Sequence, residues 1–130
     1  MNARRILAVC SLLVALNGSA AGTFAKIARV WHGRVPAAKA DDYAKYLDAA
    51  GVQKIRAIKG NCGAEMLRRL DGEVAEFYVI SYWPSRDSIR AFAGDDIEKT
   101  HHLPRDPEFL LELEEHVRHF DLPSGEHPCK

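Results

Sequence analysis

Short runs of apolar, β-branched and aromatic residues recur along the chain and predict its strands. Residues 26–35 (KIARVWHGRV), 63–70 and 74–83 (VAEFYVISYW) are such runs, and each begins or ends at a glycine or proline. This composition, interrupted by turn-forming residues, favours β-strands. The pair Asp71-Gly72, between the second and third runs, is typical of a tight hairpin. A fourth run, at 117–122, predicts a last strand.

Other segments repeat their apolar residues at the three- and four-residue spacing of a helix. In the first of them, Tyr43, Leu47 and Ala50 share one face, and Gly51 predicts the end of the helix. Ser85 is a typical N-cap for a later helix that ends at Gly94. The helical segments expected are 37–50, a short further turn within 52–58, 85–94, a short helix or turn within 95–102, and a helix that starts at Asp106-Pro107 and carries Phe109, Leu110 and Leu113 as its apolar stripe.

The order of these elements, β-α-β-β-α-β with one extra helical piece, predicts an α+β fold of the ferredoxin-like kind. Such a chain forms a four-stranded antiparallel sheet with its helices on one face. The chain of 130 residues has room for one domain. We expect this domain to span residues 22–122.

Both faces of the predicted sheet carry apolar side chains. Along residues 74–83, Phe77 and Trp83 point to one face, whereas Tyr78 and Tyr82 point to the other. A sheet with one solvated face would alternate apolar and polar residues instead. Because the helices cover only one face, we expect a second copy of the chain to cover the other and form a homodimeric α+β barrel.

The first residues of the chain carry a different pattern. Arg4 and Arg5 precede an apolar run of about 11 residues, 6–16, and the small residues Ser19-Ala20-Ala21 follow. This pattern predicts a cleavable signal peptide at residues 1–21, with an apolar run shorter than the roughly 20 residues of a membrane span. We therefore expect a periplasmic or secreted protein with no membrane association after cleavage. A cytoplasmic location is the alternative if the start site is misassigned.

Charge and cysteine content narrow the range of partners. The chain has 18 basic and 18 acidic residues and a formal net charge of +0. No basic field therefore favours nucleic acid as a partner. An oxidising compartment permits a disulfide between Cys62 and Cys129, although the sequence leaves their pairing open. Residues 123–130 are mostly polar and predict a flexible tail.

Four stretches carry a recognisable combination of residues: RVWHGRVP in the first strand, FYVISYWPSRDSIRAFAGDDIE, DPEFLLELE and HVRHFDL. Together they resemble the antibiotic biosynthesis monooxygenase-like family over about residues 26–122. The resemblance implies a dimeric α+β barrel with a pocket between sheet and helices in each subunit. Activities known in this family are the cofactor-independent oxidation of polycyclic phenols and the degradation of haem.

The best-known members of that family use an asparagine, a tryptophan and a histidine. Trp83 matches the tryptophan, at the end of the third strand. No asparagine lies between Ala25 and Val35, and Phe92 stands near the place of the histidine. The resemblance and the strand parity together give the residues expected to contact a ligand: Trp83, Trp31, Phe77, Val79, Ser81 and Phe92.

Histidines are the candidate proton acceptors. His101 and His102 follow the second predicted helix, and His119 lies in the last strand. Each could take a proton from a phenol, and His101 or His102 could instead ligate haem iron. Surface positions, with one histidine capping a helix, are the alternative for that pair. His116 and His119 lie at an odd separation on a predicted strand, which argues against a shared metal ion, and we expect His32 to be a hydrogen-bonded, half-buried strand residue.

The leading hypothesis is a cofactor-independent, monooxygenase-like protein that acts on a small, flat aromatic or phenolic substrate. No metal is expected in that reaction, and no phosphate-binding or dinucleotide-binding motif is present in the sequence. Two alternatives remain open. One is a non-catalytic module that binds a small molecule, and the other is a haem-binding or haem-degrading protein.

Overall fold

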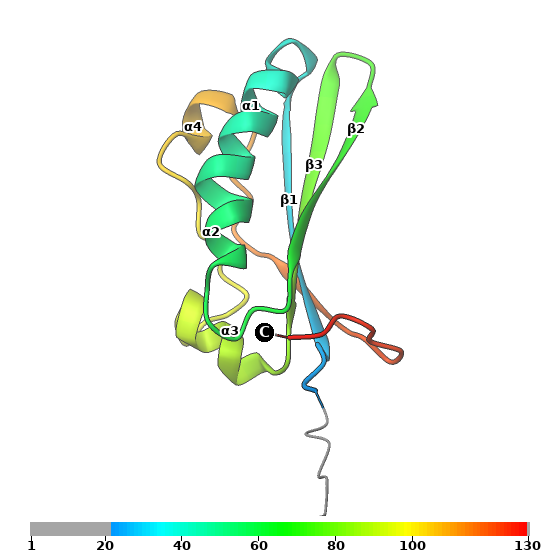
Figure 1. Ribbon diagram of the computed structural model, residues 1–130. Coiled ribbons are helices and arrows are strands. Elements are labelled where there is room, and N and C mark those ends of the chain that lie inside the picture. Colours follow the sequence, from blue (N-terminus) through cyan, green and yellow to red (C-terminus); the bar gives the residue numbers. More distant parts are fainter. Residues whose placement is uncertain (1–21, 130) are drawn as a thin grey trace, which may run out of the picture.

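The computed structural model describes residues 22–129, and the signal peptide expected at 1–21 lies outside them. The described chain forms one antiparallel sheet in the order β2-β3-β1-β4, with helices on one side (Figure 1). This arrangement confirms the predicted ferredoxin-like α+β fold. No helix among the described residues is long and apolar enough to cross a membrane. The strands are β1 (Ile27–Pro36), β2 (Ala64–Asp71), β3 (Val74–Trp83) and β4 (Arg118–Asp121).

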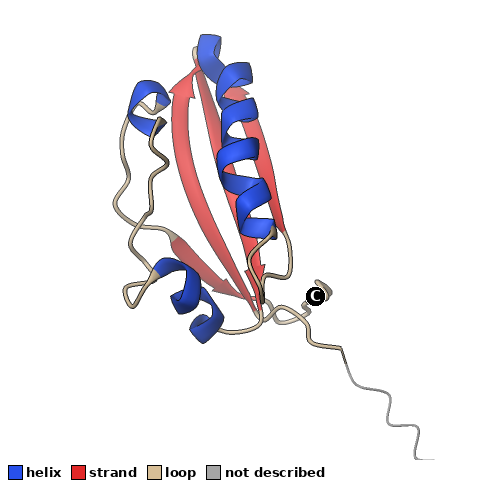
Figure 2. Cartoon of the chain, turned by 60° about the vertical axis from the view of Figure 1, so that its left-hand side comes forward, coloured by secondary structure: helices blue, strands red, loops and turns tan. Residues whose placement is uncertain are grey.

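One long helical stretch runs along the sheet from Ala37 to Arg56 (Figure 2). The sequence predicted that Gly51 ends this helix, but it does not. Its φ angle is not positive, and the chain continues through a wider helical turn. A Cβ at Gly51 would lie 3.3 Å from a methyl carbon of Leu47 and 3.4 Å from one of Leu103. The glycine therefore permits close packing. The stretch consists of η1 (Ala37–Lys39), α1 (Ala40–Leu47), η2 (Asp48–Val52) and α2 (Gln53–Arg56).

The helix α3 (Arg86–Ala93) has the boundaries that its capping residues predict. The side chain of Ser85 accepts a hydrogen bond from the backbone N–H of Ser88, and the side chain of Ser88 accepts one from the backbone N–H of Ser85. Gly94 ends the helix with a φ angle of 84°, which only glycine adopts readily. Residues 95–102 form turns, with an isolated bridge between Lys99 and His116.

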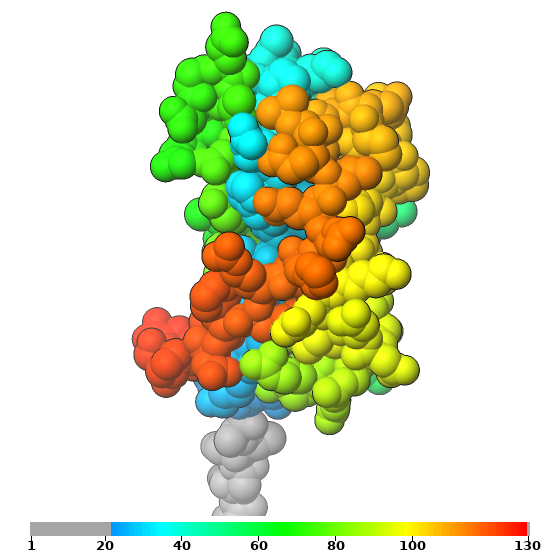
Figure 3. All heavy atoms as spheres, turned by 180° about the vertical axis from the view of Figure 1, so that it is seen from behind, coloured from blue at the N-terminus to red at the C-terminus, as the bar shows by residue number. Residues whose placement is uncertain are grey.

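The helix predicted to start at Asp106-Pro107 is much shorter than its apolar stripe suggested. α4 (Asp106–Phe109) ends after one turn, and Leu110 is extended. The backbone N–H of Leu111 donates to the carbonyl oxygen of Arg34 at 2.8 Å, so hydrogen bonding to β1 replaces further helix. Figure 3 shows the segment that follows, in orange, lying over β1.

The C-terminal segment is held in place, which corrects the expected flexible tail. Cys62 and Cys129 form a disulfide that joins positions 67 residues apart. The backbone N–H of Ala25 donates to the carbonyl oxygen of His127, and the ring of His127 stacks on Tyr82 with centroids 3.7 Å apart. Residues 123–129 therefore cover one end of the sheet, on the face opposite the helices.

The helix-facing side of the sheet holds the core. Ala75, Phe77, Val79, Ser81 and Trp83 alternate along β3, and all five are buried beneath the helices. Burial of large apolar side chains between sheet and helices is the main source of stability in such a layered domain.

Candidate functional site

A cavity of about 280 Å³ lies between the sheet and the long helix. The sheet contributes Arg29 and Trp31 from β1, together with Val79 and Ser81 from β3. The opposite wall is mostly apolar and comes from the long helix, through residues that include Leu47 and Ile55, and from Ile58 in the turn that follows it. Phe92, His101, His102, Leu103, Asp106 and Val117 complete the lining from α3 and the segments around it.

Most of the residues predicted to contact a ligand reach this cavity. Trp31, Val79, Ser81 and Phe92 line it, and so do the two adjacent histidines, His101 and His102. Three other predicted residues, Trp83, Phe77 and His119, do not line it. The parity of the strands gave the correct face, but not the distance of each residue from the cavity.

Trp83 lies one layer behind the cavity wall, where the sequence placed it on the wall itself. It is fully buried, and its ring stacks on Phe92 with centroids 5.6 Å apart and an interplanar angle of 15°. Its indole N–H donates to the hydroxyl of Ser81 at 2.9 Å. Because Phe92 and Ser81 both line the cavity, Trp83 fixes the positions of two wall residues. Phe77 is deeper still and packs edge-on against Tyr43, with centroids 5.2 Å apart.

The two histidines at the cavity have different surroundings. His101 donates from Nε2 to the carbonyl oxygen of Ala93 at 2.7 Å, so it caps the end of α3. This role matches the capping alternative for that histidine. Nδ1 of His102 is buried, and among residues 22–129 it has no hydrogen-bond partner. It lies 3.8 Å from Oδ2 of Asp106, and the side chain of His102 is 26% exposed.

Asp106 is a site residue that the sequence analysis missed. Its residue is 1% exposed, and its carboxylate accepts from the hydroxyl of Tyr43 at 3.0 Å and from the backbone N–H of Leu103 at 2.7 Å. Burial and the Asp106 carboxylate raise the pKa of Tyr43 well above its usual range, so Tyr43 stays a donor. The sequence showed this aspartate only as a helix start, because its contacts come from segments far apart in the chain.

Arg29 is the second residue that the sequence analysis missed. It faces the helices beside Trp31 and is 6% exposed, and burial lowers its pKa to about 10. One Nη group lies 3.1 Å from Nε2 of His119 on the neighbouring strand β4. Burial and, next, the charge of Arg29 lower the pKa of His119 to about 4, so this histidine is neutral near pH 7 and accepts from Arg29. The sequence did contain a signal for Arg29 as a site residue, because it is a charged residue at a strand position that faces the core.

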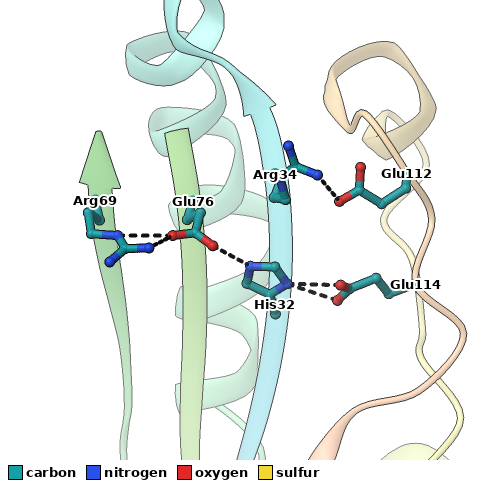
Figure 4. A network of polar contacts seen from close by, with 6 residues as sticks. All are labelled: His32, Arg34, Arg69, Glu76, Glu112 and Glu114. Carbon is teal, nitrogen blue, oxygen red and sulfur yellow. Dashed lines mark hydrogen bonds and ion pairs between the residues drawn. The ribbon is translucent and has the colours of Figure 1, made fainter. Parts of the chain in front are cut away.

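The opposite face of the sheet carries a chain of charged side chains (Figure 4). Nδ1 of His32 lies 2.9 Å from Glu114, and its Nε2 lies 3.4 Å from Glu76, which also pairs with Arg69. The hydrogen bond from Arg69 is the main cause that lowers the pKa of Glu76. His32 is thus a half-buried, hydrogen-bonded strand residue, as predicted. The described residues contain no cluster of three or more histidine, cysteine, aspartate or glutamate side chains placed to hold a metal ion.

These features define a class: a ferredoxin-like α+β domain with a largely apolar cavity between its sheet and its helices. Neither the family models nor the curated proteins compared with the chain gave a match. Among solved structures, the chain is similar to MhuD, a haem-degrader from Mycobacterium tuberculosis determined with two haems bound in its active site. The TM-score is 0.52 at 18% sequence identity, over 75% of this chain and 95% of that one. The likeness establishes a shared fold.

Proposed function

We propose that the protein binds a small, planar aromatic molecule in the cavity between the sheet and the long helix. The observation that carries the proposal is the lining, in which Trp31 and Phe92 offer flat surfaces among aliphatic side chains. Pockets for drug-sized ligands measure about 300–1,000 Å³. A cavity of about 280 Å³ therefore suits a ligand of one or two fused rings.

We further propose that the bound molecule is a phenolic substrate and that His102 takes its proton. Nδ1 of His102 lies 3.8 Å from the carboxylate of Asp106, so the proposal places the ring proton on Nδ1 and leaves Nε2 as the acceptor. A carboxylate behind a histidine orients the ring and stabilises its protonated form. The long distance is compatible with this role, because such contacts shorten when substrate binds. Tyr43 and Leu103 in turn hold Asp106 in place.

The reaction needs no resident cofactor. Loss of the phenolic proton enriches the ring in electrons, and a ring CH₂ group conjugated with it can then react with dioxygen. Overall, CH₂ and O₂ give C=O and H₂O, so the substrate supplies all the electrons. The residues of this chain bind the ring, accept the proton and keep bulk water away from the reacting carbon.

Haem binding is the second candidate, favoured by the similarity of the fold to that of MhuD. His102 would be the ligand to iron, because it lines the cavity and its side chain is partly exposed. When bound, haem would supply its own oxygen chemistry. The cavity of about 280 Å³ fits a tetrapyrrole less well than a smaller ring system. A third candidate, a non-catalytic binding module, is supported by the absence of the family's asparagine and histidine.

We also propose that the protein is an exported homodimer whose subunits meet through the sheet face opposite the helices. That face exposes Tyr78 and Phe120, which are 37% and 49% accessible in the single chain. The disulfide between Cys62 and Cys129 supports an oxidising compartment, because such bonds persist mainly outside the cytoplasm.

The test combines oxygen uptake with hemin titration of the purified protein. Among phenols with a ring CH₂ group, a substrate should be oxidised with uptake of one O₂, and His102→Gln should lower turnover by roughly 10²–10⁴-fold while leaving ligand binding intact. His116→Gln is the matched control, because this exposed histidine does not line the cavity. Tight phenol binding without oxygen uptake would select the binding module. A Soret band on adding hemin, lost in His102→Gln, would select haem.

A further inference from the structure

Arg29 places a positive charge in the interior of the domain without a negative partner. Its guanidinium contacts the carbonyl oxygens of Ile97 and Lys99 and Nε2 of His119. All three are neutral acceptors. No carboxylate among residues 22–129 forms an ion pair with it, although it is 6% exposed. A guanidinium has five N–H donors, so two of them have no partner in the described part of the chain.

This arrangement contrasts with the surface of the same protein. Six arginines whose side chains are 40–70% exposed each pair with a carboxylate: Arg34, Arg68, Arg69, Arg86, Arg90 and Arg105. Ion pairs at exposed sites contribute little to stability, whereas a buried charge without a counter-charge is costly. Of these seven arginines, Arg29 is therefore the one for which a counter-ion matters most, and it has none within the described residues.

The position of Arg29 indicates where that counter-ion comes from. Arg29 lines the cavity together with Trp31, which follows two residues later on the same face of β1, and its guanidinium lies 5.8 Å from the ring centroid of Phe92. Asp106 is the carboxylate in the cavity lining, and it already accepts from Tyr43 and Leu103. A ligand whose ring lies against Trp31 or Phe92 can present an acidic group to the free donors of Arg29.

We propose that Arg29 is an anion-binding residue of the cavity and that the natural ligand is a planar aromatic molecule with a carboxylate. This inference rests on the proposed function, since it requires that the cavity binds an aromatic ring. Recognition by a paired guanidinium and carboxylate is strong and directional, because two parallel N–H···O bonds form. The carboxylate belongs either to a small aromatic acid or to the propionate of a porphyrin.

The test compares two probes of nearly the same shape, the anionic 2-naphthoate and the neutral 2-naphthamide, by calorimetric titration of the purified protein. The wild type should bind the naphthoate roughly 10- to 100-fold more tightly, as expected for hydrogen bonds to a charged group. Arg29→Gln should bind both probes equally. Lys54→Gln and Arg56→Gln should keep the preference. Lys54 is an exposed cation in the cavity lining, and Arg56 binds the carbonyl oxygen of Ala64 outside the cavity.

Arg29 also holds the carbonyl groups of residues 97 and 99, so a purely structural role must be distinguished. If the role of Arg29 is structural, Arg29→Gln should weaken the binding of both probes and leave the ratio of their affinities unchanged. If Arg29→Gln does not fold, Arg29→Lys keeps the charge without the planar fork and should show a reduced preference. In the wild type, the preference should persist at high salt, because buried pairs are screened less than exposed ones.

Each outcome bears on one of the two proposals. Equal binding of both probes by the wild type, or a preference that survives in Arg29→Gln, overturns the role of Arg29 and leaves the aromatic cavity in place. Binding of neither probe overturns the aromatic cavity and this inference with it. A parallel titration with protoporphyrin IX and its dimethyl ester identifies the source of the carboxylate. A preference for the free porphyrin acid that exceeds the preference for the naphthoate, and that is lost in Arg29→Gln, identifies the acid as a porphyrin propionate.

Discussion

The two faces of the sheet are built differently, although the same strands form both. On the helix-facing side of β3, alternate residues from Ala75 to Trp83 are all buried. On the other side, Tyr78 and Phe120 are substantially exposed. An ionic chain through His32 and Glu76 runs across the strands on this side (Figure 4). The first face is completed within the chain, whereas the second has large apolar side chains without a cover in the described residues.

This difference separates two kinds of function. A face that is closed by its own helices can enclose a small cavity and exclude water from it. A face with exposed aromatic side chains among charged ones has the composition of a protein interface. The ligand site proposed above lies on the helix side, and the proposed dimer interface lies on the opposite side.

The largest expected effect is the removal of a side chain from the closed face. Trp83→Ala should lower the free energy of unfolding by about 3–5 kcal/mol, because a fully buried indole leaves a cavity and loses its hydrogen bond to Ser81. Leu67→Ala, on the opposite face and 45% exposed, should cost under about 1 kcal/mol. Chemical denaturation measures both, at two protein concentrations, so that self-association is separated from intrinsic stability. Similar losses for the two variants would contradict the proposed contrast between faces.

The sequence alone could predict the closed face well, because local signals agreed with the final packing there. β3 has the bounds expected from its alternating residues, the hydroxyl of Ser85 caps the start of α3, and Gly94 ends it at a positive φ angle. The predictions failed where tertiary contacts overrode local preference. The helix passes through Gly51 because Leu47 and Leu103 pack closely against it. Leu113 is exposed on an extended segment, because bonding to β1 replaces the predicted helix.

The candidate site was harder to predict than the fold, for a physical reason. His119 and Arg29 are 90 residues apart, and Tyr43 and Asp106 are 63 apart, so no spacing in the sequence reveals either pair. Parity placed Trp83 on the correct face, but only packing shows that Phe92 lies between it and the cavity. The pairing of Cys62 with Cys129 likewise depends on how residues 123–129 fold back.

A smaller effect is expected on the open face, where a charge should change association rather than folding. Phe120→Glu should weaken the proposed dimer by at least about tenfold, because a carboxylate would be buried among aromatic side chains. The free energy of unfolding of the Phe120→Glu monomer should change little, since Phe120 is 49% exposed in the single chain. Leu70→Glu is the control, because this leucine is 60% exposed on the helix-facing side of β2. Sedimentation measures the masses, and a dimer that persists in Phe120→Glu would refute this interface.

The smallest effect concerns the neutral histidine beside Arg29. Burial and, next, the charges of Arg29 and Arg86 lower the pKa of His119 from 6.5 to about 4 in the folded chain, and the charge of Glu98 opposes them. Between these values the unfolded state binds the extra proton, so folding stability from this group is present above pH 6.5 and is lost as the pH falls towards 4. Because His119 is only partly buried, we expect a loss of about 1 kcal/mol or less. His119→Gln keeps an acceptor for Arg29 without a titrating group, so its unfolding free energy should fall less than that of the wild type between pH 7 and pH 4. Parallel curves for the two proteins would show that burial and the charge of Arg29 do not hold His119 neutral.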